Sequence, residues 1–121
     1  MNRDSVLLRI PSEASYISLV RLTASSVAHK CGMNIDEIED IKMAIGEACI
    51  NSLSLTDKEE ISIEFIIDED ELHIKVLDAK EEIPEDLEET RDRKLGILIM
   101  RSLMDRVIFS DTGVEMTKYI E

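Results

Sequence analysis

The chain has 121 residues, of which 44% are hydrophobic and 34% charged, a composition typical of one globular domain with one core. Its formal net charge of −13 repels phosphate backbones and anionic membranes, so we predict no nucleic acid and no membrane as partners. A protein with a basic surface suits this charge, although acidity also serves solubility alone. No apolar run approaches the roughly 20 residues that cross a bilayer, and residues 1–5 lack a signal-peptide pattern, which predicts a cytoplasmic protein. Cys31 and Cys49 lack metal-ligand spacing and are expected to be reduced thiols.

The N-terminal part of the chain predicts a strand followed by a helix. Val6–Ile10 has the composition of a strand, which Pro11 ends. Ser12 is the expected N-cap of a helix that runs to about Cys31, with Gly32 just beyond its C-terminus. The apolar residues expected to form its buried stripe are Tyr16, Val20, Ala24, Val27 and Cys31, with Ile17 and Ala28 beside them.

A second amphipathic helix is predicted over Asn34–Leu55. Asn34 is its expected N-cap, and Glu37 stands at the position that completes a capping box. Glu47 and Asn51 are one helical turn apart, away from the centre of the apolar stripe. A carboxylate and a carboxamide on one face can hold a metal ion and a water beside a phosphate, although most such pairs are solvated surface. The expected core stripe consists of Ile38, Ile41, Ile45, Ala48, Ser52 and Leu55.

The middle of the chain predicts an antiparallel hairpin. Ile61–Ile67 and Leu72–Leu77 show alternating patterns, and Asp68–Glu71 is the short connection between them. His73 is expected to face outward from its strand rather than to bind a metal, because no second His or Cys stands at ligand spacing. Residues 79–93 lose all periodicity and are rich in acidic side chains, which predicts a surface loop.

The C-terminal part predicts a third helix and a second hairpin. Leu95–Asp105 is apolar on most sides and is therefore expected to be well buried. Val107–Phe109 and Val114–Ile120 form the last hairpin around Asp111–Gly113. The resulting fold class is α+β, a two-layer sandwich in which helices cover one face of a mainly antiparallel sheet. We expect the whole chain, 1–121, to be one domain.

The order of several motifs along the chain resembles that of the GHKL, or histidine-kinase-like, ATPases. Within that superfamily the chain is most similar to the anti-sigma factor serine kinases of bacteria, and the resemblance covers nearly its whole length. The segments that carry it are Val20–Thr23, Asp36–Lys42, Gly46–Asn51, Asp78, Leu95-Gly96, Ser102–Val107 and Met116–Tyr119.

The resemblance implies ATP and Mg²⁺ as cofactors and gives five residues a role. Glu47 would be the general base for the attacking hydroxyl, and Asn51 would help to bind Mg²⁺. Asp78 would accept a hydrogen bond from the adenine amino group, with Thr117 supporting that contact. Gly96, at a helix N-terminus, would let backbone N–H groups approach phosphate.

Departures from the family pattern predict weakened nucleotide binding. The first glycine box of the family becomes Asp78–Glu82 here, without either glycine, and Lys94 replaces the first glycine of the second box. Leu55 stands where many relatives have a histidine, and the intervening lid is short and acidic. Side chains and carboxylates obstruct and repel a triphosphate, although Lys80 or Lys94 could compensate by pairing with it.

Three functions remain open on the sequence alone. The first is an ATP-dependent protein serine kinase that also binds a sigma factor or its antagonist, and the second is a nucleotide-independent binding module of the same fold. The third is a detached sensor-kinase ATPase domain, which the absence of a histidine acceptor domain disfavours. The resemblance implies a homodimer and a partner contact at Arg21 of the first helix. Leu19 and Leu22 lie outside the buried stripe, so we expect them to belong to the same partner surface. Isolated surface leucines are the alternative.

Overall fold

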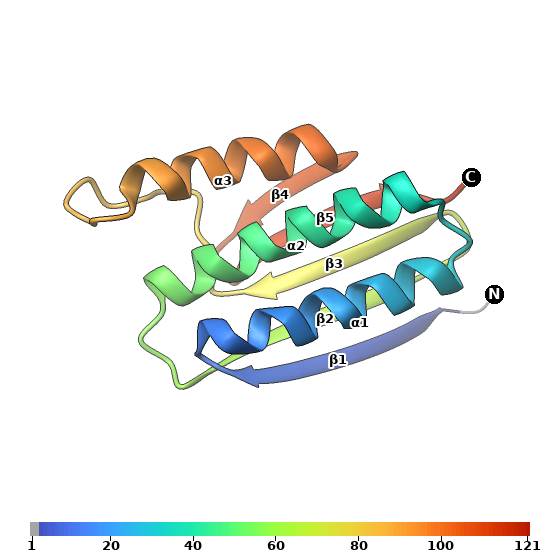
Figure 1. Cartoon of the computed structure of the whole chain (residues 1–121), viewed down its shortest axis with the longest axis horizontal. Helices are drawn as coiled ribbons and strands as arrows, with labels where there is room; N and C mark the ends of the chain where they lie inside the picture. The colour runs from blue at the N-terminus through green and yellow to red at the C-terminus, as the bar shows by residue number, and fades with distance from the viewer. Residues whose placement is uncertain (1–2) are drawn as a thin grey trace.

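In the computed structural model, which describes residues 3–121, three α-helices cover one face of a five-stranded sheet (Figure 1). The strands follow the spatial order β1-β2-β3-β5-β4, and every neighbouring pair is antiparallel. The predicted α+β sandwich is therefore confirmed. The elements are β1 (Asp4–Pro11), a 3₁₀ turn η1 (Ala14–Tyr16), α1 (Ile17–Lys30), α2 (Ile35–Leu55), β2 (Glu60–Ile67), β3 (Glu71–Leu77), α3 (Thr90–Leu103), β4 (Arg106–Ser110) and β5 (Gly113–Tyr119).

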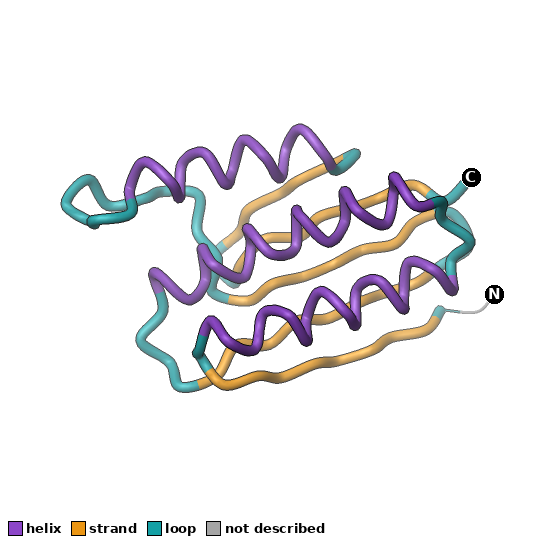
Figure 2. The backbone as a smooth tube through the Cα atoms, in the orientation of Figure 1, coloured by secondary structure: helices purple, strands orange, loops and turns teal. Residues whose placement is uncertain are grey.

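The helices lie side by side over the sheet, with α2 between α1 and α3 (Figure 2). Alternate residues of each strand face this layer, so that Ile63 pairs with Val76 and Phe65 pairs with Ile74 on the covered face. The loop that precedes α3 projects beyond the end of the sheet (Figure 2). Among residues 3–121, none of the helices combines the length and the apolar character needed to cross a bilayer.

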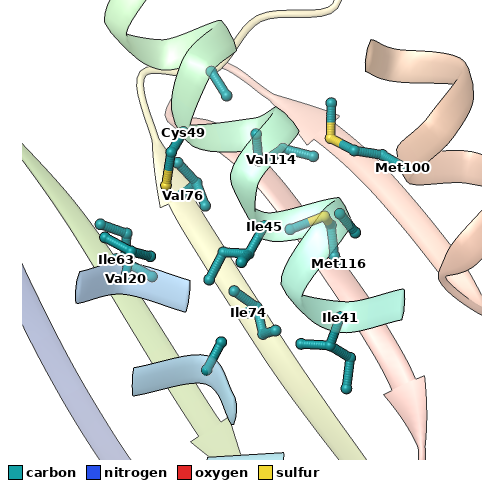
Figure 3. Close-up of a cluster of buried hydrophobic side chains, with 14 of the residues drawn as sticks. Val20, Ile41, Ile45, Cys49, Ile63, Ile74, Val76, Met100, Val114 and Met116 are labelled. Atoms are coloured by element: carbon teal, nitrogen blue, oxygen red, sulfur yellow. The ribbon is translucent and has the colours of Figure 1, made fainter. Parts of the chain in front are cut away.

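The core lies between α2 and the sheet (Figure 3). Ile41 and Ile45 of α2 are fully buried against strand residues such as Ile74 and Met116. Cys49 of the same helix is also buried, and this burial raises the pKa of its thiol to about 12, so the group stays protonated at neutral pH. Both cysteines are free, as expected.

The predicted start of α2 and the predicted glycine after α1 are confirmed by their capping geometry. The Glu37 backbone N–H donates to Asn34 Oδ1 at 2.8 Å, and the Asn34 N–H donates to Glu37 Oε1 at 3.0 Å, which is the expected capping box. Gly32 follows α1 with a φ of +80°, the left-handed conformation that a glycine adopts most easily.

The predicted start of the first helix was wrong. Ser12 does not cap it, because its hydroxyl donates instead to the Lys58 carbonyl oxygen at 2.8 Å. The 3₁₀ turn follows, and the α-helix begins only at Ile17. Tyr16, which precedes the helix, is 38% exposed, and Cys31, at the other end of α1, is half-buried, so both are less buried than expected.

The predicted third helix was misplaced and is less buried than expected. It begins at Thr90 rather than Leu95, since the Thr90 hydroxyl donates to Pro84 and Leu87 carbonyl oxygens and fixes the turn before it. Three of the four residues that follow Thr90 are Arg or Lys, which have good helix propensity, and the loss of apolar periodicity concealed this signal. Leu95 and Leu98 are 54% and 61% exposed, so one apolar side of α3 faces outward.

Candidate functional site

Glu47 lies where α2 meets α3. A Cβ atom at Gly96 would come within 2.5 Å of Glu47 Oε1, so the glycine lets α3 approach this carboxylate closely. The Glu47 side chain is 20% exposed and so still reaches solvent. Gly96 lies within α3 rather than at its N-terminus, so the prediction that its backbone opens a helix was wrong. Gly96 instead lies directly against the Glu47 carboxylate.

Arg93 is a charged residue of this site that sequence reasoning missed. The residue is only 9% exposed, and its Nη1 atom lies 3.7 Å from Glu47 Oε1. Among the described residues, no atom accepts a hydrogen bond from its Nε or Nη1. Arg93 was expected in a loop. A predicted helix that began earlier would have placed Arg93 on the same face as Gly96, three residues later. We call the contact between Glu47, Arg93 and Gly96 the α2–α3 seam.

Asn51 lies one turn beyond Glu47 and is 1% exposed. Its Nδ2 donates to the Lys80 carbonyl oxygen at 2.9 Å, and its Oδ1 accepts from the Lys80 backbone N–H at 2.8 Å. These two bonds fasten the loop after β3 to α2. The carboxamide oxygen retains one further lone pair, because a carbonyl oxygen has two.

Asp78 stands directly after β3 with a φ of +68°, a conformation that Asp and Asn tolerate better than most residues. Its N–H donates to the Thr112 carbonyl oxygen at 2.8 Å, and its carboxylate accepts from Lys58 Nζ at 3.0 Å. Ser52 ties the neighbouring strand end to α2, since its hydroxyl donates to the Leu77 carbonyl oxygen at 2.8 Å. Asp78 and Asn51 thus lie at the same end of the helix–sheet layer.

Thr117 is not brought together with these residues. It pairs with His73 across β3 and β5, on the sheet face that the helices leave open, and its hydroxyl lies 3.1 Å from His73 Nδ1. His73 faces outward as predicted, with Glu71 and Asp68 carboxylates 3.1 Å and 3.6 Å from its Nε2. The hydrogen bond from the Glu71 N–H is the main reason that the pKa of Asp68 is lowered.

The acidic loop is tied to α3 by ion pairs. Lys94 Nζ lies 2.7 Å from Glu85, and Arg101 Nη2 lies 2.7 Å from Glu81. Lys94, one of the two lysines that could compensate for the missing glycines, therefore already has a carboxylate partner. Lys80 contributes its backbone to the contact with Asn51, and its residue is exposed.

The predicted partner residues of α1 lie on two different sides of that helix. The Arg21 guanidinium rests on α2, where a Cβ at Gly46 would come within 2.5 Å of its Nη2. Leu22 is 67% exposed and lines a groove of about 680 Å³ between α1 and β1. Leu19 is 45% exposed.

Comparisons with known proteins match nearly the whole chain. Residues 10–118 match the family model described as a histidine kinase-like ATPase domain. The serine-protein kinase RsbW of Bacillus subtilis (strain 168) is 34% identical, over 98% of this chain and 88% of that protein. RsbW of Listeria monocytogenes EGD-e is 37% identical over 97% of this chain and 88% of that protein. RsbW of Bacillus cereus AH187 is 36% identical over 98% of this chain and 86% of that protein. The resemblance stated from the sequence motifs is thereby confirmed.

Proposed function

Because the chain belongs to the histidine kinase-like ATPase domain family, we propose that it is a cytoplasmic protein serine kinase that regulates a sigma factor. It binds ATP, phosphorylates a serine of an antagonist protein and holds the sigma factor itself. The observation that carries this proposal is the partly exposed Glu47 carboxylate, set in the α2–α3 seam one turn before Asn51. It stands in a chain that resembles serine-protein kinases from end to end.

Glu47 has the chemistry of a general base in this proposal. Its carboxylate accepts the proton of the attacking serine hydroxyl, a contribution of roughly 10²–10⁴ to the rate. ATP supplies the phosphoryl group, and the buried, unpaired donors of Arg93 fit an anion at this place. Asn51 would hold Mg²⁺ through the second lone pair of its Oδ1, since Mg²⁺ prefers oxygen ligands and needs few from protein.

Asp78 is the proposed adenine contact. Its carboxylate would accept the adenine amino hydrogen through Oδ2, since Lys58 Nζ contacts only Oδ1, at 3.0 Å. Gly96 contributes by admitting Glu47 rather than by touching phosphate. Thr117 is not part of the proposed site, because its hydroxyl lies on the other face of the sheet.

The alternative is a binding module that needs no nucleotide. Asp78 and Lys94 already have charged partners, and both polar atoms of the Asn51 carboxamide are bonded to Lys80. A site whose groups satisfy one another gains less from binding a ligand, because old contacts must break first. Direct measurement of nucleotide affinity separates the two functions.

The test is calorimetric titration of the chain with ATP and Mg²⁺, for the wild type and Asp78→Asn. Asn tolerates the φ of +68°, so the fold should persist. Its neutral carboxamide cannot accept a hydrogen bond with the strength of a carboxylate. Loss of a hydrogen bond to a charged group is worth about 1.5–3 kcal/mol, so we expect affinity to fall at least about 10-fold. No binding by the wild type would favour the binding module, and equal affinities would place adenine elsewhere.

A further inference from the structure

Arg93 has hydrogen-bonding capacity that the described chain leaves unused. The residue is nine-tenths buried, and neither Nε–H nor Nη1–H has an acceptor. Buried polar groups are nearly always paired, and a buried charge without hydrogen bonds is especially costly. An unmet donor of this kind in a folded protein therefore indicates a ligand, an ordered water or a structural ion pair.

The ion pair with Glu47 does not meet this need. The distance of 3.7 Å from Nη1 to Glu47 Oε1 exceeds the 2.7–3.2 Å of an N–H···O hydrogen bond, so the attraction is electrostatic only. Two other cations of α3 are engaged elsewhere, Lys94 with Glu85 and Arg101 with Glu81. Of these three α3 cations, Arg93 is the one beside Glu47.

We propose that Arg93 binds the phosphate end of the nucleotide and replaces the backbone donors that the missing glycines would have supplied. This inference rests on the proposed function. A guanidinium suits the task, because it stays charged when buried, is weakly hydrated and presents several N–H donors to phosphate oxygens. The Glu47 side chain beside these donors is 20% exposed, so solvent reaches the neighbouring carboxylate.

The same position solves a charge problem. A base carboxylate close to a triphosphate suffers like-charge repulsion, which a protein of net charge −13 does not relieve elsewhere. Arg93, whose Nη1 lies 3.7 Å from Glu47 Oε1, would attract both the carboxylate and a bound phosphate and so offset this repulsion.

The test compares Mg²⁺–ATP, adenosine and inorganic tripolyphosphate, titrated into four proteins and followed by calorimetry and thermal unfolding. The proteins are the wild type, Arg93→Gln, Arg93→Lys and the control Lys94→Gln, which removes the same charge from an exposed, paired neighbour. We expect Arg93→Gln to weaken ATP and tripolyphosphate at least 10-fold and to leave adenosine unchanged. Arg93→Lys should retain part of the affinity, and Lys94→Gln nearly all of it.

A structural role predicts a different pattern. Arg93→Gln would then lower the unliganded Tm while the shift caused by ATP stayed the same, and that result would overturn the proposal. Equal tripolyphosphate affinity in the wild type and Arg93→Gln would overturn it too, and so would no tripolyphosphate binding by the wild type. If the protein bound tripolyphosphate but not ATP, the proposed nucleotide function would be wrong, whereas an anion site at Arg93 would be supported. If Arg93→Gln fails to fold, the Arg93→Lys protein provides the test. Unchanged affinity of Arg93→Lys for ATP and tripolyphosphate would show that the guanidinium is not needed, which would overturn the proposal.

Discussion

At the scale of single residues, Gly96 controls where the Glu47 carboxylate can lie. A Cβ there would meet Glu47 Oε1 at 2.5 Å, and the carboxylate is the flexible end of a side chain that can move aside. The backbone itself stands within a helix, where Ala is favoured over Gly by up to about 1 kcal/mol. Helix stability therefore favours Ala at position 96, whereas the present position of the Glu47 carboxylate requires Gly.

We expect Gly96→Ala to leave the free energy of unfolding unchanged or to raise it, while phosphoryl transfer falls. Urea denaturation measures the first effect, and phosphate transfer to the serine-containing antagonist measures the second. Gly46→Ala is the matched control, because its Cβ would displace the Arg21 guanidinium rather than Glu47. A Gly96→Ala protein with wild-type turnover would show that the position of Glu47 does not matter for the reaction.

The candidate site was predicted in part from the residues themselves. Helical spacing placed Glu47 and Asn51 on one face, and the structure keeps them there. Arg93 escaped notice, because only the true start of α3 turns it toward Glu47. The bonds of Asn51 to Lys80 could not be predicted either, since they join residues 29 positions apart through a loop without sequence pattern.

At the scale of elements, Asn51 connects α2 to the segment that follows β3. Its carboxamide pairs with both polar backbone groups of Lys80, as a neighbouring strand would. The acidic loop leaves the sheet from this point. Exposed ion pairs, which contribute little, and the buried side chains of Ala79 and Ile83 hold it further along. Asn51 is the side chain that holds the backbone at its first residues.

Asn51→Ala should destabilise the protein by about 2 kcal/mol, since it removes two hydrogen bonds worth about 1 kcal/mol each. Hydrogen exchange with solvent at the Lys80 amide should accelerate more than exchange at the amides of the core strands. Nuclear magnetic resonance can follow both rates. Ser52→Ala is a suitable comparison, because it removes a single bond to Leu77 from the next position of the helix. Unchanged exchange at Lys80 would contradict a clasp by Asn51.

Element types were more predictable than element ends. The alternating patterns of Ile61–Ile67 and Leu72–Leu77 gave their strands and their pairing. The starts of α1 and α3 were mispredicted, because the Ser12 hydroxyl bonds to the distant Lys58 carbonyl oxygen and the Thr90 hydroxyl bonds to carbonyl oxygens of the loop before α3. Local capping preferences cannot anticipate such partners.

At the scale of the whole molecule, β1 leaves one edge of the sheet open. It pairs only with β2, and Leu7 on it is 60% exposed. The groove between β1 and α1 continues this surface, with Leu22 and Val6 among its lining residues. An exposed edge strand beside an apolar groove is a site for another chain, and we propose that a second copy of this protein covers it.

This assignment separates two surfaces of α1. The groove side carries Leu22, whereas Arg21 lies on the α2 side against Gly46. We propose that the Arg21 side meets the sigma factor or its antagonist, because an Arg beside a helix backbone offers directional bonds to a carboxylate. One helix would then serve the homodimer and the regulated partner at the same time.

Leu22→Asp should weaken the homodimer at least about 10-fold, because it puts a charge into an apolar contact, while Arg21→Glu should leave it intact. The reverse is expected for the sigma factor or antagonist, whose affinity should fall by about 1–2 kcal/mol in Arg21→Glu only. Sedimentation equilibrium and titration with the partner measure the two effects, and thermal unfolding checks each fold. A wild type that stays monomeric at every concentration would exclude the dimer. Loss of both interactions in both variants would mean that the two sides of α1 form a single surface.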